Sequence, residues 1–171
     1  SRRRFLQRTA LTAAGFSVSA ALGARAAGSP NEKINVGFIG TANRAAANLA
    51  EVGKETASVN VAALCDVDDQ YLAAAAKRHA GAKTYRDFRR LIDQKDLDAI
   101  VVSTPDHTHA VACAAALRTG RHVYSEKPLT RTVSECRVVR ELAREHRAVT
   151  QLGTQIHAGG NYRRVVELIR T

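Results

Sequence analysis

The stretch INVGFIGTANRAA, residues 34–46, decides the fold class of this chain. An apolar run typical of a β-strand (34–39) passes through Gly40 into an alanine-rich run typical of a helix, as in the phosphate-binding turn of a dinucleotide-binding sheet. The fingerprint G-x-G-x-x-G/A aligns with Gly40, Ala42 and Ala45, so alanine replaces the middle glycine. A methyl group at that position still allows a pyrophosphate to approach if the φ angle of Ala42 is negative. The turn alone leaves two interpretations open, a nucleotide site and an ordinary strand-to-helix connection.

Strand and helix patterns alternate along the rest of the chain. Further strands are predicted at 59–65, 83–85, 98–104, 122–125 and 148–153, and helices at 43–52, 68–80, 86–92, 109–119 and 132–146. The last of these helices begins with the spacing of a capping box, Thr132 and Glu135. Three helices are followed by glycines at which we expect a left-handed closing residue, Gly53, Gly81 and Gly120. Alternation with short connections predicts an α/β fold, a doubly wound parallel sheet of the Rossmann type.

The residues that directly follow the predicted strands are the candidate ligand contacts, because ligands bind beyond the carboxyl ends of the strands in such a sheet. The second strand is followed by Asp66, and the fourth by Pro105, Asp106, His107 and His109. The fifth is followed by Glu126, Lys127 and Pro128, and the sixth by Thr154, Gln155 and His157. We expect these polar groups to converge with the turn on one edge of the sheet.

Asp66 strengthens the nucleotide interpretation. It lies 26 residues beyond Gly40, at the end of the second predicted strand, where a carboxylate can accept hydrogen bonds from the hydroxyls of an adenosine ribose. The same carboxylate would repel a 2′-phosphate, so NAD is favoured over NADP. The alternative role for Asp66 is a helix N-cap, although Asp68 can also serve there.

The formal charge of +10 raises the question of nucleic-acid binding, and the distribution of that charge argues against it. Five arginines and no acidic residue lie in residues 1–28, whereas the remainder carries 21 basic and 16 acidic residues without a basic run. A surface that neutralises a nucleic-acid backbone needs clustered charge. We therefore expect no nucleic-acid partner. At 171 residues, 45% of them hydrophobic, the chain has room for one domain with a folded core.

Residues 1–30 have the layout of an export signal, with a basic start, a weakly apolar middle and a small-residue stretch. The start, SRRRFLQ, resembles the twin-arginine signal consensus with Arg2 and Arg3 as the pair, and that pathway carries folded proteins across the bacterial inner membrane. The alternatives are an arginine-rich disordered N-terminus and a short membrane anchor. We expect residues 1–30 to be a signal and linker, the twin-arginine machinery to be a partner and the location to be periplasmic.

Neither cysteines nor histidines form a metal or disulfide pattern. The cysteines are odd in number, widely spaced and placed in apolar runs, which predicts buried packing for Cys65, Cys113 and Cys136. Four histidines are expected at the ligand edge, but no acid or cysteine completes a zinc ligand set with His107, His109, His122 and His157. No metal site is predicted.

Two stretches carry a resemblance to a known family. VVSTPDHTH (101–109) and GRHVYSEKPLT (120–130) resemble the T-P-x-x-x-H and E-K-P elements of the Gfo/Idh/MocA oxidoreductase family, in the same order and separated by a helix. The resemblance implies an NAD-binding Rossmann domain over residues 31–154. Residues 155–171 would be a connecting helix or the start of the family's C-terminal α/β domain, which is otherwise absent from this chain.

By this resemblance Lys127 is the catalytic residue, donating a hydrogen bond to the hydroxyl or carbonyl that exchanges a hydride with the nicotinamide. Glu126 and Pro128 would fix its loop, with a cis bond before Pro128. The cofactor contacts implied by the turn, by Asp66 and by the resemblance are Gly40, Thr41, Ala42, Asn43, Arg44, Asp66, Thr104, Pro105, Asp106, His109, Glu126, Lys127 and Gln155.

The sequence therefore predicts an exported NAD-dependent oxidoreductase, with NADP less favoured, that transfers a hydride to or from a sugar or polyol. The identity of the sugar stays open, and a homo-oligomer of the longer protein is allowed. One alternative is an NAD-dependent glycoside hydrolase acting by transient oxidation, against which Lys127 argues because that group typically replaces this lysine. The other is a non-catalytic NAD-binding fragment. Because the family's second domain carries further catalytic residues, we expect this chain alone to bind cofactor without turnover.

Overall fold

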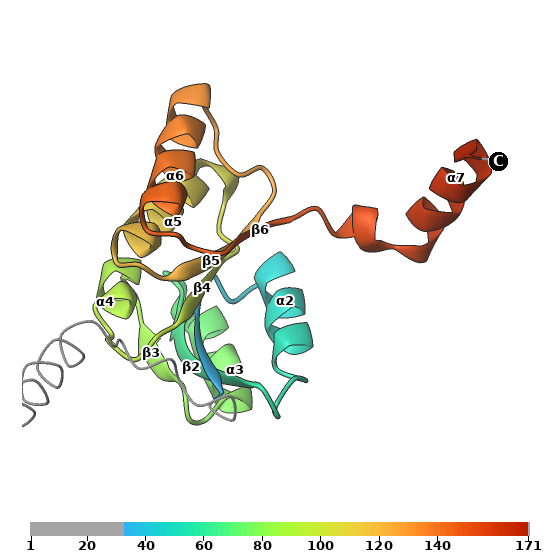
Figure 1. The fold of residues 1–171 in the computed structure, drawn as a ribbon. Helices are drawn as coiled ribbons and strands as arrows, with labels where there is room; N and C mark the ends of the chain where they lie inside the picture. The colour runs from blue at the N-terminus through green and yellow to red at the C-terminus, as the bar shows by residue number, and fades with distance from the viewer. Residues whose placement is uncertain (1–32, 171) are drawn as a thin grey trace, which may run out of the picture. The chain divides into compact units, whose positions relative to one another are not determined.

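The computed structural model describes residues 33–170 (Figure 1), so the predicted export signal with Arg2 and Arg3 lies outside the described residues. A six-stranded parallel sheet forms the centre of this part, in the order β3-β2-β1-β4-β5-β6. The strands are β1 (Ile34–Ile39), β2 (Val59–Cys65), β3 (Lys83–Tyr85), β4 (Ala99–Val102), β5 (His122–Glu126) and β6 (Thr150–Gly153). The chain reverses its direction of winding between β1 and β4, which confirms the predicted doubly wound fold.

Helices cover both faces of the sheet (Figure 1). The helices are α2 (Arg44–Val52), α3 (Asp69–Arg78), α4 (Phe88–Ile92), α5 (His109–Arg118), α6 (Val133–Glu145) and α7 (Gly160–Arg170), with short 3-10 helices η1 (Asp106–Thr108) and η2 (Gln155–Ala158). α2 and α3 contribute to one buried cluster, and α4, α5 and α6 to the other. Within residues 33–170, no helix has the length and apolar character needed to cross a membrane.

The central strands are buried on both faces, as a parallel sheet between two helical layers requires. In β1, Phe38 joins the cluster with α2 and α3, whereas the next residue, Ile39, joins the cluster on the opposite face. In β4, Val101 and Val102 divide in the same way. Each fully buried side chain of this size contributes about 1.5–3 kcal/mol relative to its exposed state. Burial of neighbouring residues on opposite faces therefore fixes β1 and β4 in the sheet up to the edge at which both strands end.

Two strands are shorter than predicted. β4 ends at Val102 rather than at residue 104, and β6 begins at Thr150 rather than at residue 148. Ser103 still donates its backbone N–H to the carbonyl of Ile39 (2.9 Å), but Pro105, two residues later, has no N–H with which to continue the ladder. The chain therefore leaves the sheet at this point.

The capping predictions succeed in part. The capping box of α6 is present, with Thr132 Oγ1 accepting from the N–H of Glu135 (3.2 Å) and Glu135 Oε2 accepting from that of Thr132 (2.9 Å). Gly120 adopts the expected left-handed conformation, with φ of 76°. The prediction is wrong for Gly53, whose φ of −67° continues the right-handed turn, and for Gly81, because α3 is already closed by His79.

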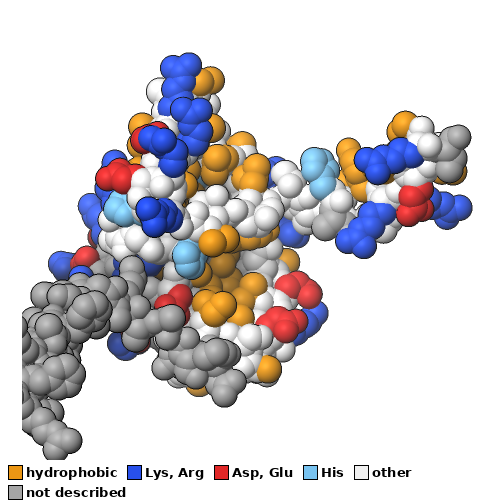
Figure 2. All heavy atoms as spheres, viewed as in Figure 1, with side chains coloured by type: hydrophobic (Ala, Val, Ile, Leu, Met, Phe, Trp, Pro, Cys, Tyr) orange, Lys and Arg blue, Asp and Glu red, His pale blue; other side chains and the backbone are white. Residues whose placement is uncertain are grey.

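Cys136 is exposed, so the prediction that all three cysteines are buried is wrong for this one, whereas Cys65 and Cys113 are buried. α6 contacts the core from Val139 onward, and its first turn lies outside that contact. Figure 2 shows basic side chains along the outer side of α6.

Burial raises the pKa of Cys65 to about 12, with a smaller effect of the same sign from Asp66. Cys65 therefore packs as an apolar thiol.

Candidate functional site

The turn after β1 requires glycine at its first position. Gly40 has φ of 93°, and a Cβ atom there would lie 2.5 Å from the backbone oxygen of Ser103. The φ angle of Ala42 is not positive, so the condition for replacing the middle glycine is met. Asn43 instead takes a positive φ of 50° immediately before α2, a conformation that costs a non-glycine residue free energy. The turn thus brings β1 close to β4 and directs the start of α2 toward the ligand edge of the sheet.

Asp66, at the end of β2, is tied to this turn. Its Oδ2 accepts hydrogen bonds from the backbone N–H and the hydroxyl of Thr41, both at 2.8 Å, and its Oδ1 accepts from the N–H of Asp68 at 3.1 Å. The N-cap of α3 is Asp68, which accepts from the N–H groups of Gln70 and Tyr71. Because a carboxylate offers about four acceptor positions, three contacts leave Asp66 able to accept one from a ligand hydroxyl.

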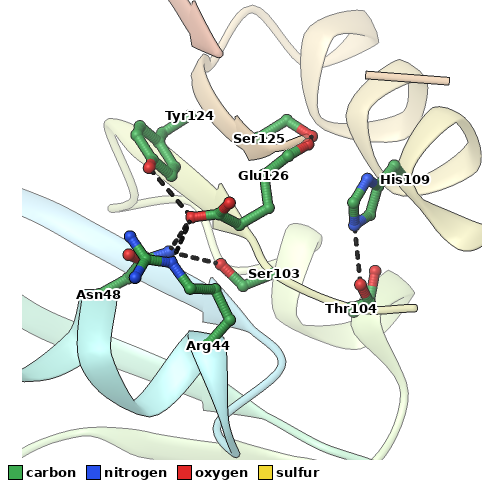
Figure 3. A network of polar contacts seen from close by, with 8 residues as sticks. All are labelled: Arg44, Asn48, Ser103, Thr104, His109, Tyr124, Ser125 and Glu126. Atoms are coloured by element: carbon green, nitrogen blue, oxygen red, sulfur yellow. Dashed lines mark hydrogen bonds and ion pairs between the residues drawn. The ribbon is translucent and has the colours of Figure 1, made fainter. Parts of the chain in front are cut away.

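A buried carboxylate lies at the end of β5, where Glu126 is 4% exposed (Figure 3). Its Oε1 accepts hydrogen bonds from Arg44 Nε at 3.0 Å, Asn48 Nδ2 at 2.8 Å and the Tyr124 hydroxyl at 3.1 Å. Asn48 also donates to the hydroxyl of Ser103 at 3.0 Å. The network therefore links the start of α2 to the ends of β4 and β5.

The charge state of this network follows from its hydrogen bonds. Burial alone would raise the pKa of Glu126, but the hydrogen bonds from Asn48, Arg44 and Tyr124 outweigh burial and hold that pKa below its ordinary value. The hydrogen bond to Glu126 raises the pKa of Arg44. Burial, together with the charge of Glu126, raises the pKa of Tyr124. Glu126 is therefore an anion, and Arg44 its cationic partner, at neutral pH.

Gly153, the last residue of β6, packs directly against this network. A Cβ atom on Gly153 would lie 2.6 Å from the Tyr124 hydroxyl and 2.8 Å from Cδ of Glu126. A side chain at position 153 would therefore displace Tyr124, Glu126 or both.

His109, at the start of α5, is 1% exposed and joins two loops. Its Nδ1 lies 2.6 Å from the carbonyl oxygen of Pro128, and its Nε2 lies 2.7 Å from that of Thr104. A neutral imidazole carries a single N–H and can donate to only one of these oxygens at a time. Both ring nitrogens face backbone, so His109 holds the loop after β4 against the loop that carries Lys127.

A cavity of about 230 Å³ opens at this edge of the sheet, and it is lined by Arg44, Ser103, Thr104, Asp106, His109, Glu126, Lys127 and Gln155. All except Ser103 are predicted site residues. The peptide bond between Lys127 and Pro128 is cis, as predicted. The other predicted residues do not line the cavity: Gly40, Thr41, Ala42 and Asn43 form the turn, Asp66 binds that turn and Pro105 directly precedes η1. Their contacts with a cofactor stay a prediction.

Sequence reasoning missed Asn48, Ser103, Tyr124 and Gly153. Two patterns could have found part of this set: Asn48 is four residues after Arg44 on one helical face, and Tyr124 is two residues before Glu126 on one face of a strand. His122 was wrongly expected at the ligand edge, because it is the first residue of β5 and therefore lies at the opposite edge. Among residues 33–170, no group of three or more histidine, cysteine or acidic residues is placed to hold a metal ion.

Comparison with known proteins identifies the family. The family model described as the oxidoreductase family Gfo/Idh/MocA, NAD-binding Rossmann fold, matches residues 34–154. The chain belongs to the Gfo/Idh/MocA family. This membership confirms the resemblance carried by the T-P-x-x-x-H and E-K-P elements, and it confirms NAD as the cofactor class of the domain.

Relatives of this Gfo/Idh/MocA chain include proteins named as inositol dehydrogenases and as a member of a glycosyl hydrolase family. It is 36% identical over 121 residues to inositol 2-dehydrogenase 2 of Saccharopolyspora erythraea, an alignment covering 70% of this chain and 36% of the relative. It is 36% identical over 118 residues to a glycosyl hydrolase family 109 protein of Solibacter usitatus, covering 63% and 27%. The chain thus spans about a third of the length of the first of these relatives and about a quarter of the second.

The fold also matches a crystal structure of scyllo-inositol dehydrogenase from Lactobacillus casei with bound NAD(H) and scyllo-inositol. The TM-score is 0.75 at 22% identity, and the match covers 81% of this chain and 41% of that one. At this level of identity the likeness establishes the shared fold.

Proposed function

We propose that this chain is the cofactor-binding part of an NAD(H)-dependent dehydrogenase that acts on a sugar or polyol. The observation that carries the proposal is the position of Lys127 on one cavity with Arg44, Glu126 and Gln155, at the edge where the phosphate turn also ends. The relatives named as inositol dehydrogenases support a substrate with several hydroxyl groups.

The residues present fit a dinucleotide. The turn at Gly40 leaves no room for a side chain, and α2 begins shortly after it. The backbone N–H groups at the N-terminus of a helix suit a pyrophosphate. Asp66 keeps an acceptor position for a ribose hydroxyl. When bound, the nicotinamide supplies hydride chemistry, and the chain supplies placement and proton traffic.

Lys127 would position the reacting oxygen of the substrate. Its ammonium group can donate a hydrogen bond to a hydroxyl or carbonyl oxygen held in the cavity. Oε1 of the neighbouring Glu126 does not compete with the substrate for the hydrogen bond from Lys127, because that oxygen already accepts from three donors. His109 fixes the backbone just after Lys127, because its ring contacts the carbonyl oxygen of Pro128.

The proposal predicts that the 171-residue chain binds NADH in the micromolar range or more weakly, as measured by fluorescence titration. The family's second domain supplies further catalytic groups, so sugar or polyol oxidation by the chain alone should be absent. Absence of NADH binding by a folded chain would refute the cofactor site. Measurable oxidation would refute the need for a second domain.

We also propose export through the twin-arginine pathway, on the strength of SRRRFLQ at the start of the chain. The periplasm holds little free NAD, so a protein that folds and binds its cofactor before crossing gains from this route. Fusion of residues 1–30 to a reporter should place it in the periplasm, and replacing Arg2 and Arg3 by lysine should abolish that transport. A reporter that stays inside the cell, or one exported equally well by both versions, would contradict this.

A second candidate activity is glycoside hydrolysis by transient oxidation, favoured by the similarity to the Solibacter usitatus protein. Lys127 argues against it. In the protein that contains both domains, release of free sugar without net formation of NADH would favour this activity, whereas stoichiometric NADH would favour the dehydrogenase. The remaining alternative, a non-catalytic NAD-binding module, predicts neither outcome even with both domains present.

A further inference from the structure

Arg86, the residue after β3, reaches across the end of β2 next to Asp66. β3 pairs with β2 in register, Tyr85 opposite Cys65, and the N–H of Asp66 donates to the carbonyl of Tyr85 at 3.2 Å. The Nη2 of Arg86 donates to the carbonyl oxygen of Val67, the residue that follows Asp66, at 3.1 Å. The guanidinium therefore lies at the edge where the adenosine ribose is proposed to bind.

The acidic partner of Arg86 holds it weakly. Its Nε lies 3.1 Å from Oδ1 of Asp69, and the two side chains are 67% and 69% exposed. An ion pair between such exposed groups contributes little to stability, so the guanidinium can leave Asp69 at small cost. Val67, between Asp66 and this pair, is also exposed, at 79%.

We propose that Arg86 determines how far this site tolerates a phosphate on the adenosine ribose. The inference rests on the proposed cofactor site. Asp66 disfavours a 2′-phosphate by charge repulsion. Arg86 supplies an adjacent guanidinium whose planar N–H groups match phosphate oxygens in pairs. The preference for NADH over NADPH is therefore the balance of these two side chains, and removal of Asp66 exposes a 2′-phosphate site built on Arg86.

The test is fluorescence titration of NADH and NADPH against the unaltered chain and the variants Arg86→Gln, Asp66→Ser and the double variant. Arg86→Gln should weaken NADPH binding roughly tenfold, the loss of a charge-assisted contact, and change NADH binding less than about twofold. Asp66→Ser should shift the ratio of affinities toward NADPH by about tenfold or more, and the double variant should lose that shift.

Arg89→Gln is the matched control, because Arg89 is also largely exposed, follows the same strand and pairs with an acidic residue, Asp87, whereas the hydrogen bond to the carbonyl of Val67 comes from Arg86. It should leave both affinities unchanged within about twofold, which excludes a general effect of net charge. Arg86→Lys keeps the charge without the planar fork and should recover only part of the NADPH affinity. Calorimetric titration with 2′,5′-ADP and AMP, which differ only in the 2′-phosphate, should give the same ranking.

The outcomes separate the two proposals. If the unaltered chain is folded and binds neither NADH nor AMP, the cofactor site is wrong, and the role of Arg86 is refuted with it. If NADH binds but Arg86→Gln lowers both affinities equally, or Asp66→Ser keeps its NADPH shift without Arg86, only the role of Arg86 is refuted.

Discussion

Glu126 at the end of β5 holds Arg44 at the start of α2 through an ion pair of 3.0 Å. The two residues are 82 positions apart in the chain, and the contact crosses the point at which the sheet reverses its winding. It links the phosphate turn to the loop that carries Lys127. One buried carboxylate thus joins the proposed cofactor site to the proposed reaction centre.

Replacing Glu126 with glutamine should lower the free energy of unfolding by about 1–3 kcal/mol, because Oε1 loses the charge that three donors share. Urea denaturation measures this. Glu141→Gln is the control, because Glu141 forms an exposed pair with Arg144, and its removal should leave the free energy of unfolding nearly unchanged. Equal effects of the two changes would contradict the importance of the buried network.

The same glutamate should make stability depend on pH. The pKa of Glu126 in the folded chain lies below its ordinary value of 4.5, so its stabilising effect is fully present above that value and is lost as pH falls further. The difference in unfolding free energy between the unaltered chain and Glu126→Gln should be constant from neutral pH down to about 5 and shrink below about 4.5. A difference that grows as pH falls would show that the pKa is raised instead.

Replacing Gly153 with alanine should disturb the network from the side of β6. The added methyl group would meet the Tyr124 hydroxyl at 2.6 Å, and we expect a loss of about 1–3 kcal/mol in urea denaturation. Gly81→Ala is the matched control, because open space surrounds a Cβ there and φ is not positive. That change should be neutral or stabilising by up to about 1 kcal/mol. Equal losses at both positions would count against the packing of Gly153 on the network.

Asp66 and Asp68 should separate binding from stability. Asp66→Ala should weaken NADH binding by about 1–3 kcal/mol, because a ribose hydroxyl loses its acceptor. Asp68→Ala removes the N-cap of α3 and should lower stability by about 1 kcal/mol while NADH affinity stays the same. An unchanged affinity in Asp66→Ala, measured by fluorescence titration, would show that Asp66 only orients Thr41.

The sheet and the ligand edge could be predicted because both depend on local order in the sequence. Buried strands read as apolar runs, and in a parallel sheet the residues that follow them must share an edge, which gave Asp66, Thr104 and Lys127. The network around Glu126 could not be predicted in the same way. Tyr124 and Gly153 meet only because β5 and β6 are neighbours, and no local pattern states which strand lies beside which.

Helix ends show a similar limit. Gly53 and Gly81 follow helices, yet neither adopts the left-handed conformation. The chain continues in a right-handed turn at Gly53, and α3 closes at His79, two residues before Gly81. Cys136 is apolar in character and periodic in position, but α6 meets the core only beyond it. Periodicity identifies a face, whereas the length of contact along that face depends on where the neighbouring elements end.

The most direct test of the whole account is an NMR titration of the backbone amides of the chain with AMP and with NADH. AMP should shift the amides of Thr41 and Asp66 and leave that of Lys127 in place, whereas NADH should shift all three. Shifts of Thr41 and Asp66 without Lys127 in the presence of NADH, or shifts at none of the three, would contradict a single cofactor site running from the turn to the cavity.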